Sequence, residues 1–328
     1  MATTNNITTT YAGEFAQKYI SPALLSGTTL SNQLITIVPN VKYKHVISKV
    51  NIDDVVKDGT CDFDPTSTIT QTERILEPTE LQTNLQLCKK DYHNTWLAIE
   101  QGYSAHDDLP KSFADYLIGY VASKVAARIE TLIYQGDSAS AHQFDGFEKI
   151  FSTDALLPAA QEVTGTTISD SNVIAELNKI VDAIPSSLYG GEDTIIYASQ
   201  NYVRAYIRAL GGYAALTNVA GTENVASIGA NGINSQGTMW YTTGTGLTIG
   251  GVNIVMANGL SDNTAFATQR ENLFFGTGLL SDHNEVKVID TSDTLGDQNV
   301  RIVMRYTAGV QVGNIEDVVT YGITNSAN

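Results

Sequence analysis

Cysteine and basic residues are both scarce in this chain of 328 residues. Cys61 and Cys88 are the only cysteines, and their separation matches no zinc-ligand pattern. We therefore expect reduced thiols in a cytosolic protein rather than a disulfide framework. Lys and Arg total 19 against 35 Asp and Glu, a formal net charge of −16. That balance argues against nucleic-acid binding through the bulk surface, because phosphate contacts need cations.

Long hydrophobic runs and targeting signals are missing as well. No stretch reaches the roughly 18 apolar residues of a membrane-spanning helix, so we expect no membrane partner. The first residues, MATTNNITTTYAGEF, lack the basic start and apolar centre of a signal peptide. The composition is 42% hydrophobic and 16% charged, which allows a sizeable core. The length suggests about two domains, or one domain with a large excursion.

Motifs that carry catalysis are absent or weak. There is no GxSxG elbow and no GxxxxGK[ST] phosphate loop, and no two of the five histidines stand at metal-ligand spacing. Asp290, Asp293 and Asp297 resemble part of a cation loop but lack its closing Glu, so a polar hairpin loop is the preferred interpretation. Cys88 beside two lysines suggests an activated thiol, but a strand edge explains it equally well. We expect no enzyme, no catalytic residue, no cofactor and no metal.

The longest helix signal covers residues 110–136. Pro110 fits the first turn of a helix, Gly136 fits its C-terminal cap, and the apolar residues between them recur every three or four positions. We expect a core helix with charged residues, Glu130 among them, between the apolar positions. The apolar set is Phe113, Tyr116, Leu117, Tyr120, Val121, Val125, Ile129, Leu132 and Ile133.

Residues 41–91 alternate between apolar and polar side chains, which is typical of strands, and their turns are polar. The pattern predicts a two- or three-stranded excursion with few large apolar residues in its middle. An isolated hairpin is marginal in water, so the excursion needs a surface to pack on. Two interpretations stay open: a flap over its own subunit, or an arm laid over a neighbouring subunit.

The rest of the chain mixes helices and strands without a repeat, which indicates an α+β fold. We expect a helix capped by Ser169 or Asp170 that runs through Ile184, and a second helix capped by Ser199. Residues 213–236 are expected to form a long loop. Short strands are expected at 34–38, 194–198, 238–242, 252–257, 264–268, 272–276, 285–289 and 300–306.

Several segments resemble the major capsid proteins of tailed bacteriophages. The resemblance lies in ENLFFGT at 271–277, LSD at 280–282, VRIVMRY at 300–306, AGVQV at 308–312 and EDVVTYG at 316–322. IYQGD at 133–137 with FDGF at 144–147 resembles the end of that family's long helix. TERIL at 72–76 and LCKKD at 87–91 resemble the return strands of its extended loop.

The resemblance implies the Hong Kong 97-type capsid fold. The N-terminal arm would be residues 1–40 and the extended β-loop 41–95. The peripheral domain would be 96–167 with the spine helix at 110–136. The axial domain would be 168–262, and 263–328 would return to the peripheral domain.

The function implied is a structural shell protein that assembles with itself, as pentamers and hexamers, into an icosahedral phage head in the host cytoplasm. Scaffolding, portal and decoration proteins are the implied partners, and double-stranded DNA would be enclosed without sequence-specific binding. Glu73, Arg74, Lys89 and Lys90 are the candidate inter-subunit ion-pair residues; an unpaired solvated face explains them as well.

Three other functions stay open. A nanocompartment shell of the encapsulin type would share the fold but load protein cargo. A hydrolase would build its site from scattered acids, such as Asp290 and Asp293. A secreted β-rich adhesin is the third, which the missing signal peptide weakens.

Overall fold

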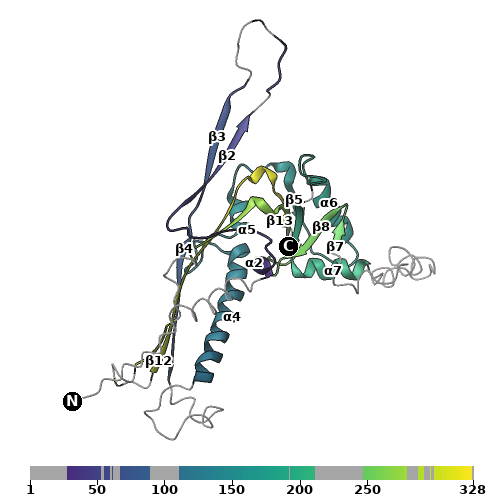
Figure 1. Ribbon diagram of the computed structural model, residues 1–328. Helices are drawn as coiled ribbons and strands as arrows, with labels where there is room; N and C mark the ends of the chain where they lie inside the picture. The colour runs from purple at the N-terminus through teal and green to yellow at the C-terminus, as the bar shows by residue number, and fades with distance from the viewer. Residues whose placement is uncertain are drawn as a thin grey trace, which may run out of the picture.

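The computed structural model describes residues 28–52, 55–59, 61, 67–88, 111–191, 193–210, 247–278, 287–291, 296 and 299–326. These residues form an α+β structure with sheets of five, six and two strands. Figure 1 shows the larger sheets and their helices in the body of the molecule, while the two-stranded sheet, β2–β3, projects from it.

The predicted long helix is α4 (Lys111–Gln135). Five of the apolar positions expected to face the core are buried: Val121, Val125, Ile129, Leu132 and Ile133. Tyr120, expected on the same face, is 51% exposed and carries the Lys124 ammonium over its ring. Tyr134 completes the buried face and contacts Phe147.

Glu130 lies between the apolar positions of α4, as the sequence pattern indicates, yet it is not exposed. Its carboxylate is buried and accepts hydrogen bonds from the Thr28 hydroxyl at 2.9 Å and the Thr29 hydroxyl at 2.5 Å. The Thr29 backbone N–H also donates to it, at 3.3 Å. The Tyr134 hydroxyl lies 2.7 Å from the Thr29 hydroxyl. Glu130 thus fastens the short helix α2 (Thr28–Ser31) to α4, and partners this distant in sequence leave no local signal.

The five-stranded sheet is built around β12 (Asn299–Val312), which runs six residues past the predicted Tyr306. β12 pairs with β10 (Leu273–Thr277) and β11 (Lys287–Asp290), and with β4 (Thr79–Cys88) along ten residues. β1 (Thr36–Val38) adds to β10 in parallel. One face of β12 is buried in the main core: Val300, Ile302, Met304, Tyr306 and Ala308.

The six-stranded sheet has the order β5 (Glu162–Gly165), β13 (Val319–Ser326), β9 (Ala265–Gln269), β6 (Thr194–Ala198), β8 (Val252–Met256), β7 (Leu247–Ile249). The predicted strand at 194–198 is confirmed, and all five of its residues are buried. α5 (Phe147–Thr153) packs against β13, and Phe266 of β9 stacks on Tyr197 at 4.7 Å between ring centroids.

The helices α6 (Val173–Ala183) and α7 (Gln200–Leu210) share a second core with this sheet. The predicted cap of α6 is wrong, because the helix begins at Val173 with Asn172 as its N-cap. Asn172 closes the preceding turn instead: its side-chain oxygen accepts from the Ser169 N–H at 2.8 Å, and its amide donates to the Thr167 carbonyl at 3.0 Å. Residues 1–27 of the expected arm, the strand at 238–242 and the loop at 213–236 lie outside the described residues, whereas α2 and β1 lie within the arm's remaining part.

Three single-turn 3-10 helices complete the described elements: η2 (Ala159–Gln161), η3 (Arg270–Asn272) and η4 (Ile315–Asp317). η3 leads directly into β10, and η4 lies between β12 and β13.

Candidate functional site

The projecting sheet is an antiparallel pair of β2 (His45–Ile52) and β3 (Ile69–Leu76), so the predicted excursion has two strands. The third expected strand, β4, belongs to the five-stranded sheet instead. His45 pairs with Leu76 and Ile52 with Ile69. Because residues directly opposite each other share a face, this register divides the side chains of the pair between two faces of different chemistry.

One face, the outward face, carries five exposed apolar side chains beside Ser48, Gln71 and Glu73. Two apolar pairs lie across it, Val46 with Ile75 and Ile52 with Ile69, and Val50 lies between them. These five side chains are between 41% and 67% exposed. The hydrophobic effect disfavours such a row of branched apolar side chains in water. The described part of the chain leaves these side chains exposed, which does not fit the flap interpretation.

The opposite face, the inward face, is fastened to the body by polar contacts. The Lys49 ammonium donates to the Asn314 side-chain oxygen at 2.8 Å and pairs with Glu316 at 2.7 Å. Arg74 pairs with Asp154 at 2.5 Å, and both side chains are mostly buried. Lys49 and Arg74 thus hold the hairpin to its own subunit and Leu76 is buried at its base, whereas the five outward apolar side chains stay exposed in the described part of the chain.

Between the hairpin and β4 the chain passes close to two glycines of the five-stranded sheet. Gly276 and Gly309 are directly paired in the β10–β12 ladder. A Cβ at Gly276 would lie 2.9 Å from the Leu76 side chain, and one at Gly309 would lie 2.9 Å from the Cα of Pro78. Glycine is thus required at both positions for the hairpin base to cross the sheet.

Beside the hairpin base, the hydrogen bond and charge of Glu77 raise the pKa of Lys44.

The candidate inter-subunit residues fall on both faces of the hairpin and beyond it. Glu73 pairs with Ser48 across the outward face and is exposed, whereas Arg74 uses its guanidinium within its own chain. An inter-subunit contact by either residue stays a prediction. Lys89 and Lys90 lie outside the described residues.

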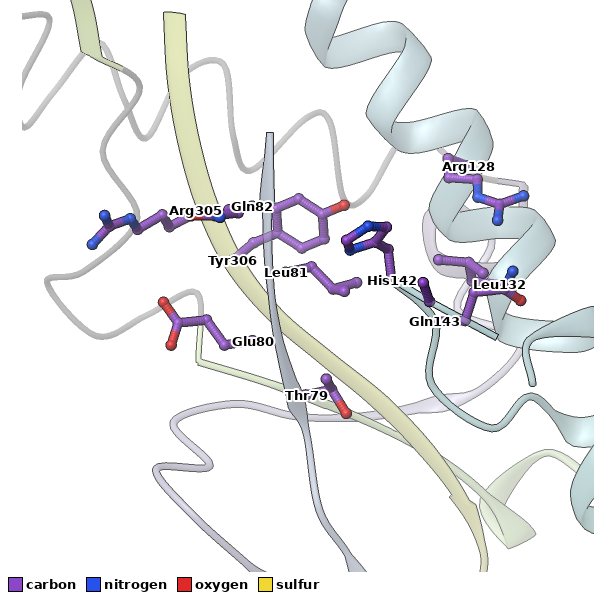
Figure 2. A pocket seen from close by; sticks show the side chains of 11 residues that line it. Thr79, Glu80, Leu81, Gln82, Arg128, Leu132, His142, Gln143, Arg305 and Tyr306 are labelled. Atoms are coloured by element: carbon purple, nitrogen blue, oxygen red, sulfur yellow. The ribbon is translucent and has the colours of Figure 1, made fainter. Parts of the chain in front are cut away.

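A cleft of about 740 Å³ lies between α4 and the first half of β4. Figure 2 shows Leu81, His142 and Tyr306 in the space between the strands and α4, while Glu80 and Arg305 point to the other side of the strands. The remaining lining comes from Thr79, Gln82, Arg128, Leu132, Ala141 and Gln143.

The cleft is cationic in a strongly acidic chain. Its charged lining residues are Arg128, Arg305 and one acid, Glu80, and its other ionisable groups are His142 and Tyr306. Because Glu80 and Arg305 both point away from α4, Arg128 supplies the formal charge that borders the space beside α4. Burial raises the pKa of Tyr306, while the Arg128 charge and a hydrogen bond with Thr83 act against that rise.

The alternative acidic site is not assembled by the described residues. Asp290 ends β11 and Asp293 lies outside them, and within the described ranges no group of three His, Cys, Asp or Glu side chains could hold a metal ion. No helix in the part of the chain described here is both long and apolar enough to cross a membrane.

No protein-family model and no curated protein matches the chain. Solved structures do. A chain of the satellite phage P4 procapsid, in a structure that includes the size determination (Sid) protein, is similar over 96% of this chain and 93% of its own, with 11% identity and a TM-score of 0.58. This chain has a phage capsid fold. The capsid of the native GTA particle gives 13% identity and a TM-score of 0.56, with 91% of this chain and 89% of that chain covered. Gordonia phage Cozz gives 12% and 0.54, over 92% and 87%.

Proposed function

We propose that this chain is the major capsid protein of a tailed phage and assembles with itself, as pentamers and hexamers, into an icosahedral head around double-stranded DNA. The observation that carries the proposal is the outward face of the hairpin, whose exposed apolar side chains suit contact with another molecule. The capsid fold of the solved structures supports the same function. No catalytic role is proposed, and the location is the virion, after assembly in the host cytoplasm.

The energetics favour a repeated contact between copies. Burying a half-exposed Val or Ile side chain contributes about 1 kcal/mol, so the five residues of the outward face contribute roughly 5 kcal/mol per copy. That is modest for a single pair of subunits, given what association costs in entropy. In a closed shell every copy makes the contact, so the sum becomes large.

The domain roles are part of the proposal. Residues 1–40 serve as the arm and 41–95 as the extended loop. Residues 96–167 and 263–328 form the peripheral domain, and 168–262 form the axial domain. The formal net charge of −16 suits an inner wall that encloses DNA without binding its sequence. Scaffolding, portal and decoration proteins are the further partners.

Electron microscopy of the purified protein, with size-exclusion mass on the same sample, tests the proposal. We expect closed shells or five- and six-membered rings. A strictly monomeric protein at high concentration would contradict self-assembly by this chain.

A matched pair of variants tests the role of the hairpin. Val50→Asp places a charge on the outward face and should abolish shells without unfolding the monomer. Thr72→Asp, on the opposite face of the same strand pair, should still assemble. If Val50→Asp formed shells with the wild-type yield, the proposed contact through the outward face of the hairpin would be contradicted.

A further inference from the structure

Strand β4 is an open edge of the five-stranded sheet. In the described part of the chain it pairs with β12 along ten residues and with no other strand. The other edges of the two larger sheets are β1, β11, β5 and β7, and each of these strands has three or four residues. An open edge presents unpaired backbone N–H and C=O groups, so proteins usually keep it short. β4 is the exception among these edges.

The edge of β4 also lacks the features that normally prevent a further strand from pairing. Its sequence, TELQTNLQLC, contains one charged residue, Glu80, and no lysine, proline or glycine. Its register with β12 runs without a bulge from Thr79 opposite Ala308 to Cys88 opposite Asn299. Lysines, prolines and bulges are the usual protection of an exposed edge. β4 is therefore suited to accept another strand through its backbone.

The side chains of β4 form one apolar row and one polar row. Figure 2 shows Leu81 on the side of α4 and Glu80 on the opposite side of the strands. Because side chains alternate along a strand, Thr83 and Leu85 share the side of Leu81. Leu85 is 41% exposed there. The row on the other side continues from Glu80 with the exposed side chains of Gln82, Asn84 and Gln86.

A second copy of β4 complements these two rows. In an antiparallel pair with a two-fold axis at Thr83, each residue lies opposite one of the same row. The opposed pairs are Leu81 with Leu85, Gln82 with Asn84, and Glu80 with Gln86. Apolar side chains then meet apolar ones, amides meet amides, and the two Glu80 carboxylates stay apart. A shift of one residue would place the leucines opposite amides, so the pattern selects the register.

We propose that the open edge of β4 pairs antiparallel with the β4 edge of a second copy of this chain, about a two-fold axis at Thr83. The two five-stranded sheets then form one continuous sheet, with α4 of both copies on the same side. From Glu80 to Gln86 the pairing extends over roughly 20 Å. This inference rests on the proposed self-assembly and specifies one isologous contact between copies.

Disulfide trapping between two differently tagged copies tests the inference. In a background with Cys61→Ser and Cys88→Ser, copies with Gln82→Cys are mixed with copies that carry Asn84→Cys and are co-assembled under mild oxidation. Opposed residues of antiparallel strands have Cα atoms about 4.5–5.5 Å apart, within the range of a disulfide. Either variant alone is the matched control, because position 82 of one copy lies diagonal to position 82 of the other, about 7–8 Å away.

We expect a covalent heterodimer on a non-reducing gel from the mixture, and at most a trace of dimer from either variant alone. Shells that form normally but give no heterodimer, or as much dimer from one variant alone, would overturn the β4 contact and leave the proposed function standing. If the wild type forms neither shells nor rings, the proposed function fails and this inference fails with it.

A charge pair at the same two positions provides a second test. Gln82→Lys combined with Asn84→Lys places lysine opposite lysine twice, and we expect the protein concentration needed for assembly to rise about tenfold. Gln82→Lys combined with Asn84→Glu places lysine opposite glutamate twice and should assemble near the wild-type concentration. Equal assembly of the two double variants would contradict the pairing.

Discussion

The β2–β3 hairpin and the β6–β9 pair are both antiparallel and rich in branched or aromatic residues, yet these residues are exposed in the hairpin and buried in the β6–β9 pair. Ile196, Tyr197 and Phe266 are fully buried, while Val50 and Ile69 are more than half exposed. The same β pattern therefore describes a core strand in one region and an open surface in the other. The difference lies in what covers each sheet: α5, α6 and α7 pack with the six-stranded sheet, whereas no described residue shields the outward face from solvent.

The largest expected effect is a loss of stability when an aromatic side chain is removed from the body of the molecule. Phe266→Ala removes a ring that stacks on Tyr197 at 4.7 Å and meets Phe151 at 5.1 Å between centroids. We expect a loss of about 3–5 kcal/mol in the free energy of unfolding, measured by urea denaturation of the unassembled protein. The control, Val50→Ala on the hairpin, should change it by no more than about 0.5 kcal/mol. Equal losses for both variants would contradict the contrast between the regions.

The second effect concerns the buried polar link between α2 and α4. Glu130→Ala leaves the Thr28 and Thr29 donors without their acceptor, and we expect about 1–3 kcal/mol of destabilisation in the same urea experiment.

Glu130→Gln keeps an acceptor oxygen and should cost less than the alanine variant. If Glu130→Ala were neutral, the carboxylate would not fasten α2 to the helix.

The smallest effect belongs to the inward face of the hairpin. The Lys49 pair with Glu316 is partly exposed, so Lys49→Ala should cost no more than about 1 kcal/mol of global stability. Its effect should be local: amide hydrogen exchange should become faster in β2 and β3 and stay unchanged in β6 and β9. Faster exchange throughout the body would show that this contact supports the whole fold.

The sequence predicts the body of this molecule well because its signals are local. The 3.6-residue period gives α4 within one residue at each end, and the apolar run TIIYA gives the buried strand β6. The predicted strands after residue 250 are present with shifted ends, and β12 extends to Val312.

What the sequence misses depends on partners far along the chain. Glu130 has the pattern of a surface residue, and only its contacts with Thr28 and Thr29, about a hundred positions earlier, make it a buried acceptor. The alternation in 41–91 does not show which sheet each strand joins. The pattern alone therefore assigns β4 to the excursion, whereas β4 pairs with β12 in the five-stranded sheet. His142 and Arg128 lack a motif, and the fold alone brings them to the same cleft.

Electron cryomicroscopy of the assembled particle tests the central claim, that the apolar face of the hairpin belongs to the assembly. We predict a neighbouring copy within contact distance, about 4.5 Å, of the side chains of Val46, Val50, Ile52, Ile69 and Ile75. Closed shells in which this face stays open to solvent, or folds back onto its own subunit, would contradict it.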